Sequence, residues 1–286
     1  MVCSVSIRIS FMRIAILVAL TLLVAPAWAG LPFCGIAPGS MVEASPKLMK
    51  AATEGNIAGM WKAIGNCANP NYQDKDGVPI LGAVFKAKPK NMLAVVKLLA
   101  SIGADVNARI YILPISFDLV GSPDCDPQVL DVLFKHGLNP NDTGPIAGMN
   151  ALEAALLDGD SNSVCISSLI EHGSYVNFVD QDGDTPLSMA ANRGDPDIVK
   201  LLLENGAQPN TSNKLGLTPL MNAAGTKHAG VAKVLLQYGA NPCLMNEDGY
   251  RASDIAKMMG DGKLAELLEC HRRNPKTTAP TNRTLL

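Results

Sequence analysis

Two stretches of the chain, 33 residues apart, carry the same short motif. The first reads Asp182-Gly-Asp-Thr-Pro-Leu187 and the second reads Lys214-Leu-Gly-Leu-Thr-Pro-Leu220. A threonine at a helix start accepts a hydrogen bond from a free backbone N–H, and a proline after it has no N–H that needs a partner. The motif therefore predicts a helix that begins directly after Thr185 and another that begins directly after Thr218.

A second motif follows each of these and also recurs. The stretch Leu201-Leu-Leu-Glu-Asn-Gly-Ala-Gln-Pro-Asn210 returns as Leu235-Leu-Gln-Tyr-Gly-Ala-Asn-Pro242 and as Leu98-Leu-Ala-Ser-Ile-Gly-Ala-Asp-Val-Asn107. Its one-sided apolar residues predict a short second helix, and its glycine predicts the end of that helix. Further copies begin at Leu133, at Leu169 and, in degenerate form, at Ile64. Such repetition at a fixed period indicates a stacked repeat protein.

With both motifs on one period, the chain resembles the ankyrin-repeat family. The resemblance covers roughly residues 45–271 and implies an all-α solenoid of helix-turn-helix units with β-hairpin tips, stacked because one unit cannot bury its apolar face alone. The third unit matches poorly, and Ser188 and Met221 stand where the family usually has histidine. We place the units at residues 45–74, 75–107, 108–141, 146–177, 181–210, 214–242 and 247–271.

The N-terminus has the pattern of a secretory signal. Arg8 and Arg13 precede an apolar run from Ile14 to Val24, and small residues stand at Ala27 and Ala29. This pattern predicts a cleaved signal peptide over 1–29, with an uncleaved anchor as the alternative. The run is shorter than the ~20 residues of a membrane span. We expect a periplasmic or secreted protein without a membrane span, then a cap segment at 30–44 and a disordered tail at 272–286.

Cysteine usage agrees with export. Six cysteines follow the predicted signal: Cys34, Cys67, Cys125, Cys165, Cys243 and Cys270. An even number in an exported chain permits disulfides, although sequence alone does not choose their pairing. Their places in the units suggest three pairs, 34 with 67, 125 with 165, and 243 with 270. The alternative is that the cysteines are buried free thiols.

Composition excludes several classes of protein. The chain has 24 Lys+Arg against 26 Asp+Glu, which argues against a nucleic-acid binder, and its 48% of hydrophobic residues argues against a disordered chain. We find no Cys-x-x-Cys, no Gly-x-Gly-x-x-Gly and no Gly-Lys-Ser/Thr, so the sequence indicates no metal or cofactor. His136 and His172 stand at predicted helix ends and read as structural. Asp180, Asp182 and Asp184 read as turn residues, because the distal glutamate of a calcium loop is missing.

The resemblance implies a protein-binding role on a concave face formed by hairpin tips and first helices. Aromatic residues, methionine and arginine are the usual interface anchors. Val179 is a further candidate, as an apolar residue at a hairpin tip. The full set of candidates is Tyr72, Arg109, Phe178, Val179, Arg193, Met221 and Met245. Phe178 has an alternative reading, which is packing against the next tip.

We therefore expect a non-enzymatic, monomeric module that binds another protein. It would support a periplasmic enzyme or neutralise a toxin, and the sequence does not separate these two roles. One alternative is a secreted effector that acts on host proteins. The other is an enzyme with its site in the irregular third unit, which contains Asp124, Asp126 and His136.

Overall fold

The structure is a computed structural model that describes residues 38–110, 113–120, 125–144, 148–157 and 163–270. The chain divides into two compact units, each of which contains several repeats, and we describe the two separately. Unit 1 comprises Met1–Leu119 and Asp126–Asn139, and unit 2 comprises Val120–Cys125 and Pro140–Leu286. The predicted signal peptide, Cys34 and the predicted tail at 272–286 lie outside the described residues.

Unit 1 is built of short helices in pairs. Its helices are α2 (Pro38–Thr53), α3 (Ile57–Gly65), α4 (Ile80–Ala87), α5 (Met92–Ser101), most of α6 (Ile115–Val120) and α7 (Pro127–Lys135). Helix α2 packs against α3 and α4, and α5 packs against α7. The strands β1 (Arg109–Ile110) and β2 (Leu113–Pro114) pair antiparallel as a small hairpin before α6.

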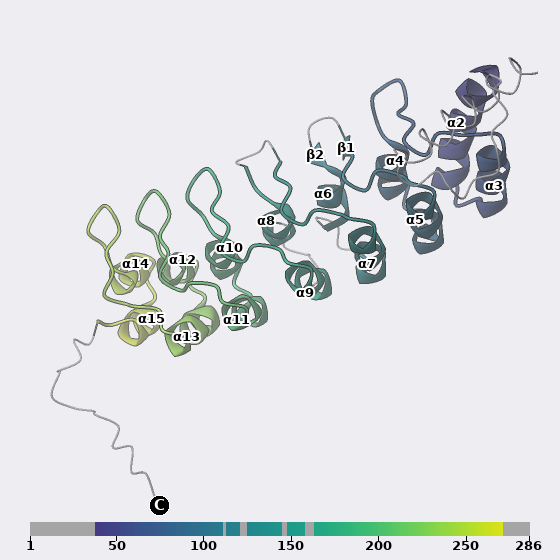
Figure 1. Ribbon diagram of the computed structural model, residues 1–286. Coiled ribbons are helices and arrows are strands. Elements are labelled where there is room, and N and C mark those ends of the chain that lie inside the picture. The colour runs from purple at the N-terminus through teal and green to yellow at the C-terminus, as the bar shows by residue number, and fades with distance from the viewer. Residues whose placement is uncertain (1–37, 111–112, 121–124, 145–147, 158–162, 271–286) are drawn as a thin grey trace, which may run out of the picture. The chain divides into compact units, whose positions relative to one another are not determined.

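Unit 2 repeats one helix pair along the chain. The pairs are α8 (Ala151–Leu157) with α9 (Ser163–Glu171), α10 (Pro186–Arg193) with α11 (Pro196–Glu204), α12 (Pro219–Gly225) with α13 (Ala229–Gln237), and α14 (Ala252–Met258) with α15 (Gly262–Leu267). The first helices α8, α10, α12 and α14 pack side by side, and α9, α11 and α13 form a second layer (Figure 1). This arrangement is the all-α solenoid that the sequence predicts.

The helix starts confirm the predicted caps. Thr185 accepts a hydrogen bond from Ser188 N–H, and the Ser188 hydroxyl accepts one from Thr185 N–H. This reciprocal pair is a capping box that satisfies two helix-end donors at once. At α12 the Thr218 side chain accepts a hydrogen bond from Met221 N–H. A proline is the first residue of both helices. Ser188 therefore has a structural role at the place of the family's usual histidine.

The second helices end in a left-handed residue. Gly206 has φ 88° and Gly239 has φ 87°, a conformation that glycine adopts at little cost. Cys67 stands at the corresponding place after α3 and adopts φ 65°. The first repeat thus keeps the geometry of the others without the glycine.

The structure differs from the sequence expectation at the N-terminal end. Helix α2 begins at Pro38, inside the segment predicted as a cap, and continues through Pro46. Proline fits the first helical turn, as at Pro38, because its fixed φ is helical and its missing N–H needs no partner there, whereas Pro46 lies in the helix interior. The first helix is therefore longer than the predicted unit boundary at residue 45 allows.

Asparagines join successive repeats. In each case the side-chain amide donates to a glycine carbonyl of the following repeat, and the side-chain oxygen accepts from a backbone N–H two residues beyond it. Asn71 and Asn107 do this in unit 1, and Asn141, Asn177 and Asn210 do it in unit 2. Within the ranges given above, no helix is long and apolar enough to cross a membrane.

Candidate functional site

Hairpins project beyond the first helices of unit 2 and bond directly to each other. Lys214 N–H donates to the carbonyl oxygen of Asp182 at 3.1 Å, and Glu247 N–H donates to that of Leu215 at 3.2 Å. We call the hairpins 178–185, 211–218 and 244–251, together with α8, α10 and α12, the hairpin face. Because their backbones are bonded, the three hairpins present their side chains as one surface.

Glycine makes this close approach possible. Gly183 has φ +84°, and a Cβ there would lie 2.8 Å from the backbone nitrogen of Lys214. Gly216 has φ +74°, and a Cβ there would lie 2.8 Å from the backbone nitrogen of Glu247. Any side chain at either position would push two hairpins apart, so these glycines set the spacing of the surface.

Each of the three hairpins exposes a large apolar side chain. Val179 is 52% exposed, Leu215 is 61% exposed and Met245 is 52% exposed. Val179 and Met245 are contact candidates from the sequence, whereas Leu215 is not. Leu215 occupies the hairpin position that Asp182 occupies one repeat earlier, and this replacement of a charge by leucine is the signal that could have identified it.

The other sequence candidates have different surroundings. Tyr72 is half-buried and Arg109 is exposed in β1, both in unit 1. Phe178 and Arg193, in unit 2, are half-buried.

Met221 is not a contact residue, because it is only 2% exposed. It stands at the fourth position of the Thr-Pro-Leu motif, where Ser188 is also buried. That position faces the interior of the repeat stack, so an apolar side chain there contributes to the core and not to a surface.

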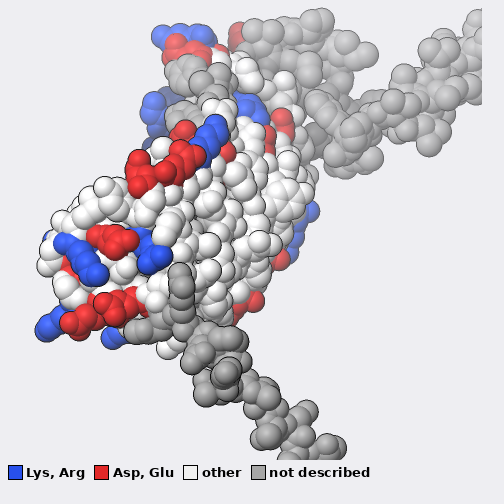
Figure 2. Space-filling view, turned by 90° about the vertical axis from the view of Figure 1, so that its left-hand side faces the viewer, with Lys and Arg blue, Asp and Glu red and all other residues white. Residues whose placement is uncertain are grey.

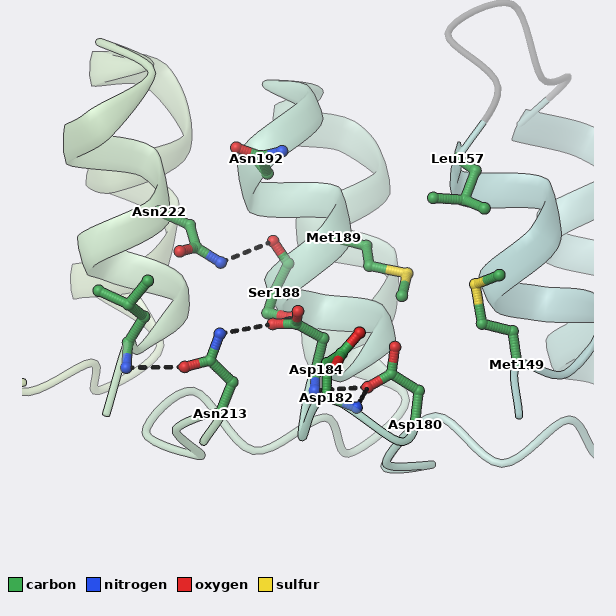
Figure 3. A pocket seen from close by; sticks show the side chains of 11 residues that line it. Met149, Leu157, Asp180, Asp182, Asp184, Ser188, Met189, Asn192, Asn213 and Asn222 are labelled. Carbon is green, nitrogen blue, oxygen red and sulfur yellow. Dashed lines mark hydrogen bonds between the residues drawn. The ribbon is translucent and has the colours of Figure 1, made fainter. Parts of the chain in front are cut away.

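A hollow opens on the hairpin face next to α8, α10 and α12 (Figure 3). Its volume is about 450 Å³. Met149 and Leu157 lie on the α8 side, and the side chains of Met189 and Asp180 lie across from them. The described residues that line it are Met149, Leu157, Asp180, Asp182, Asp184, Ser188, Met189, Asn192, Asn213, Leu217 and Asn222.

The hydrogen bonds under the hollow hold its polar residues in place. Asp180 Oδ1 accepts from the N–H groups of Asp182 and Asp184 at 2.9 and 2.8 Å, which confirms the reading of Asp180 as a turn residue. Asp184 Oδ1 accepts from the Ser188 hydroxyl at 3.0 Å and from Asn213 Nδ2 at 3.1 Å. These bonds link the hairpin of one repeat to the hairpin of the next.

A buried carboxyl group lies near these aspartates. Glu153 in α8 is 0% exposed, and its Oε2 accepts from Asn150 N–H at 3.1 Å in a capping box like that of Thr185 and Ser188. Its Oε1 has no hydrogen-bond partner. Burial raises the pKa of Glu153 from 4.5 to about 7; the bond from Asn150 lowers it in part, and the charges of Asp180 and Asp184 raise it further. The sequence reading missed this residue, although the Asn150–Glu153 spacing is that of a capping box.

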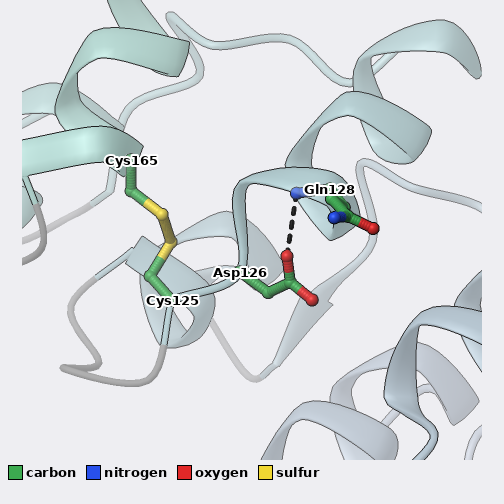
Figure 4. Close-up of a disulfide and its surroundings, with 4 residues drawn as sticks. All are labelled: Cys125, Asp126, Gln128 and Cys165. Carbon is green, nitrogen blue, oxygen red and sulfur yellow. Dashed lines mark hydrogen bonds between the residues drawn. A yellow bond between two sulfur atoms is a disulfide. The ribbon is translucent and has the colours of Figure 1, made fainter.

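The structure does not bring together the residues of the enzyme alternative in the third repeat. Asp126 caps the start of α7 by accepting from Gln128 N–H at 2.9 Å (Figure 4). His136 ends the same helix, with Nδ1 2.8 Å from the carbonyl oxygen of Val132. About ten residues at ~1.5 Å rise put the two at opposite ends of the helix. They form no joint site, and Asp124 lies outside the described residues.

His172 repeats the helix-end arrangement of His136, with Nδ1 2.8 Å from the carbonyl oxygen of Ser168. Both histidines therefore have the structural place that the sequence indicates. In the part of the chain that the structure describes, no three His, Cys, Asp or Glu side chains are arranged to hold a metal ion.

Two of the suggested cysteine pairs form disulfides in the structure. Cys125, directly before α7, bonds to Cys165 in α9, with Cα atoms 6.4 Å apart (Figure 4). Cys243 bonds to Cys270 across a Cα distance of 5.0 Å and holds the last repeat to the hairpin before it. The remaining suggested pair includes Cys34, which is outside the described residues.

The α14–α15 end of unit 2 carries charges of both signs, unlike the hollow. Figure 2 looks onto this end and shows acidic and basic side chains interspersed, with apolar and polar neutral surface beside them. Charge of a single sign therefore does not mark this end, whereas the charged side chains that line the hollow in the described part of the chain are all acidic.

Comparisons with known proteins agree with this architecture. The family model for ankyrin repeats in three copies matches residues 122–213 and 187–279. The crystal structure of the human ASB11 ankyrin repeat domain superposes with a TM-score of 0.64 at 25% sequence identity, covering 78% of this chain and 97% of that one. In all, 503 chains of solved structures match, whereas no curated protein sequence does.

The two overlapping matches to the family model span more than half of the chain. Ankyrin repeats are protein–protein interaction modules, and their fold is typically non-enzymatic. This chain belongs to the ankyrin-repeat family.

Proposed function

We propose that this protein is an exported, non-enzymatic module that holds a partner protein on the hairpin face of unit 2. The observation that carries the proposal is that three hairpins bonded to each other each expose a large apolar side chain, Val179, Leu215 or Met245, which we call the apolar row. Apolar side chains clustered on a surface mark interaction sites more often than singly exposed ones do. Methionine and leucine at such positions give contact area to a partner.

Rigidity adds to this argument. The hairpin backbones bond to each other through Asp182 and Leu215, and Asp180 and Asn213 hold the turns from within. A surface that is already ordered loses little conformational entropy on binding. Burial of the apolar row against a partner can therefore contribute to the binding affinity with little loss to ordering.

Export is supported by the sequence pattern of residues 1–29 and by the cysteine pairs. Disulfides persist in oxidising compartments such as the bacterial periplasm. The Ala-Trp-Ala29 cleavage pattern favours a bacterial periplasm over a eukaryotic secretory route. Within that compartment we propose that the partner is either an enzyme that the module supports or a toxin that it neutralises; release outward as an effector on host proteins is the alternative.

A matched pair of variants tests the face. Val179→Glu adds a charge to the row, and Val164→Glu adds one to α9 in the second-helix layer, where the valine is 53% exposed. Each variant is immobilised and incubated with the exported fraction of the cells that make the protein, and bound proteins are quantified by mass spectrometry. Val179→Glu should reduce capture of the partner at least tenfold, and Val164→Glu should not.

Both variants should unfold at the temperature of the original protein, since each changes only an exposed side chain. Equal capture by the two variants would overturn the assignment of the hairpin face. The activity of the captured partner, with and without the module, then separates enzyme support from toxin neutralisation: stimulation indicates the first, and inhibition indicates the second.

A further inference from the structure

The hollow on the hairpin face gives a more specific inference, which rests on the proposed function. We propose that the hollow bounded by α8, α10 and α12 receives an arginine side chain of the partner protein.

The charge of the hollow is unbalanced. Among the described residues Asp180, Asp182 and Asp184 line it, and no described lysine or arginine does. None of these three carboxylates forms an ion pair with a residue that the structure describes. Lys214, on the neighbouring hairpin, contributes only its backbone N–H to Asp182. The negative charge is therefore available to a partner.

The hairpin itself does not require this charge. In the next repeat Asn213, Leu215 and Leu217 stand at the positions of the three aspartates. Asn213 Oδ1 accepts from the N–H groups of Leu215 and Leu217 at 3.0 Å each, the same two bonds that Asp180 accepts. A neutral residue thus builds the same turn, so the charges of Asp180 and Asp182 are additional to what the turn needs, whereas Asp184 also accepts from Ser188 and Asn213.

A fourth carboxyl group, that of Glu153 in α8, is not among the described residues that line the hollow but interacts electrostatically with two of the aspartates. Glu153 is fully buried, its Oε1 has no partner, and its carboxyl group is close enough to Asp180 and Asp184 to feel both charges. Burying a polar oxygen without a hydrogen bond is costly. A positive charge placed at the three aspartates would offset the repulsion among their charges.

The shape and chemistry of the wall fit a long cationic side chain. Met149, Leu157 and Met189 give an apolar side against which methylene groups can pack (Figure 3). Arginine buries its methylene stem on such surfaces and directs several N–H donors from a planar group to carboxylates. A bare metal ion fits less well, because no cluster of three metal-ligating side chains is formed among the described residues.

The test uses a defined probe. The peptide N-acetyl-Gly-Arg-Gly-amide is titrated into the isotope-labelled protein at low salt, and backbone NMR shifts are followed. The matched probe carries citrulline, which has the shape of arginine without its charge. The arginine peptide should shift the signals of Asp182, Ser188 and Asn222 with a Kd on the order of 1 mM. The citrulline peptide should bind at least tenfold more weakly.

Two double variants test where the arginine peptide binds. Asp180→Asn with Asp182→Asn removes two charges and keeps the turn acceptor, as Asn213 shows. This double variant should weaken the binding of the arginine peptide about tenfold. The control is Asp74→Asn with Asp76→Asn in unit 1, because Asp74 Oδ1 accepts the same two turn bonds there. That control should leave the shifts unchanged.

Two results would overturn the proposal: equal binding of the arginine and citrulline peptides, or arginine binding that survives loss of the two charges. The outcome is distinguishable from failure of the proposed function. A partner whose capture depends on Val179 but not on Asp180 and Asp182 would leave the hairpin face assigned and remove arginine from the hollow.

Discussion

The side-chain amide of Asn177 donates a 2.9 Å hydrogen bond to the carbonyl oxygen of Gly206, the left-handed residue that follows α11. The Asn177 Oδ1 accepts from Gln208 N–H, also at 2.9 Å. One side chain thus satisfies an acceptor and a donor of the next repeat. The same two bonds recur at Asn71, Asn107, Asn141 and Asn210, so this asparagine acts as a connector between repeats.

Asn177→Ala should lower the free energy of unfolding by about 1–2 kcal/mol, because two hydrogen bonds between repeats are lost. Urea unfolding followed by circular dichroism measures this change. Asn205→Ala is the matched control, since Asn205 Nδ2 bonds only to the carbonyl oxygen of Leu201 within its own helix. The control should cost less than about 0.5 kcal/mol. Equal losses for the two variants would contradict the connector role.

Glu153 should make stability depend on pH. Its pKa is about 7 in the folded protein against 4.5 for an ordinary glutamate. Between these values the folded protein holds a proton that the unfolded chain has lost, so stability falls as pH rises, by about 1.4 kcal/mol per pH unit. The loss is complete once the pH exceeds about 7.

Glu153→Gln should remove this dependence, because the amide carries no charge at any pH in that range. The variant should be more stable than the original protein by about 3 kcal/mol at pH 8 and equal to it near pH 4. Denaturant unfolding across the pH range measures both limits. Glu247→Gln, on an exposed hairpin, controls for loss of one negative charge. Parallel pH profiles for the original protein and Glu153→Gln would refute the assignment.

Gly183→Ala should disturb the joined hairpins. The new Cβ would meet the backbone nitrogen of Lys214 at 2.8 Å, and the residue would keep a positive φ of +84°. We expect a loss of about 1–3 kcal/mol together with faster amide exchange at Lys214. Gly249→Ala is the control, because its φ is +81° but nothing lies within 4 Å of the added Cβ. Similar exchange at Lys214 in both variants would show that the contact is unimportant.

Removal of the Cys125–Cys165 bridge by serine at both positions should cost about 2–4 kcal/mol, since the bridge closes a loop of 40 residues in the unfolded chain. Thermal unfolding with and without a reducing agent measures the loss. Reductant should lower the melting temperature of the original protein more than that of the double variant. If the reductant acts equally on both, this bridge does not contribute to stability.

The sequence predicted most of the fold from local chemistry. Thr185 and Thr218 cap the helices they were expected to cap, and Gly206 and Gly239 end the second helices. These features depend on a few neighbouring residues, which is why they can be recognised without coordinates. The start of α2 at Pro38, within the predicted cap segment, was not predicted, because the repeat motifs begin only further along the chain.

The candidate contacts were predicted less well, because exposure depends on neighbours far along the chain. Met221 was expected at the surface and is buried, while Leu215 was not expected there and is 61% exposed. Both lie in the same repeat, and their residue types alone do not distinguish them. What separates them is that the fourth motif position faces the interior and the hairpin tip faces outward.

The sequence by itself determined the repeat period, the helix pairs and their caps, because each repeat carries its own start and stop signals. Only the tertiary structure decided where a site could form. The hollow is assembled from Met149, Asp180 and Asn213, which belong to three successive repeats, and the charges of Asp180 and Asp184 on the next hairpin raise the pKa of the buried Glu153. Stacking alone brings these groups together, since no local pattern encodes which side chains of neighbouring repeats will meet.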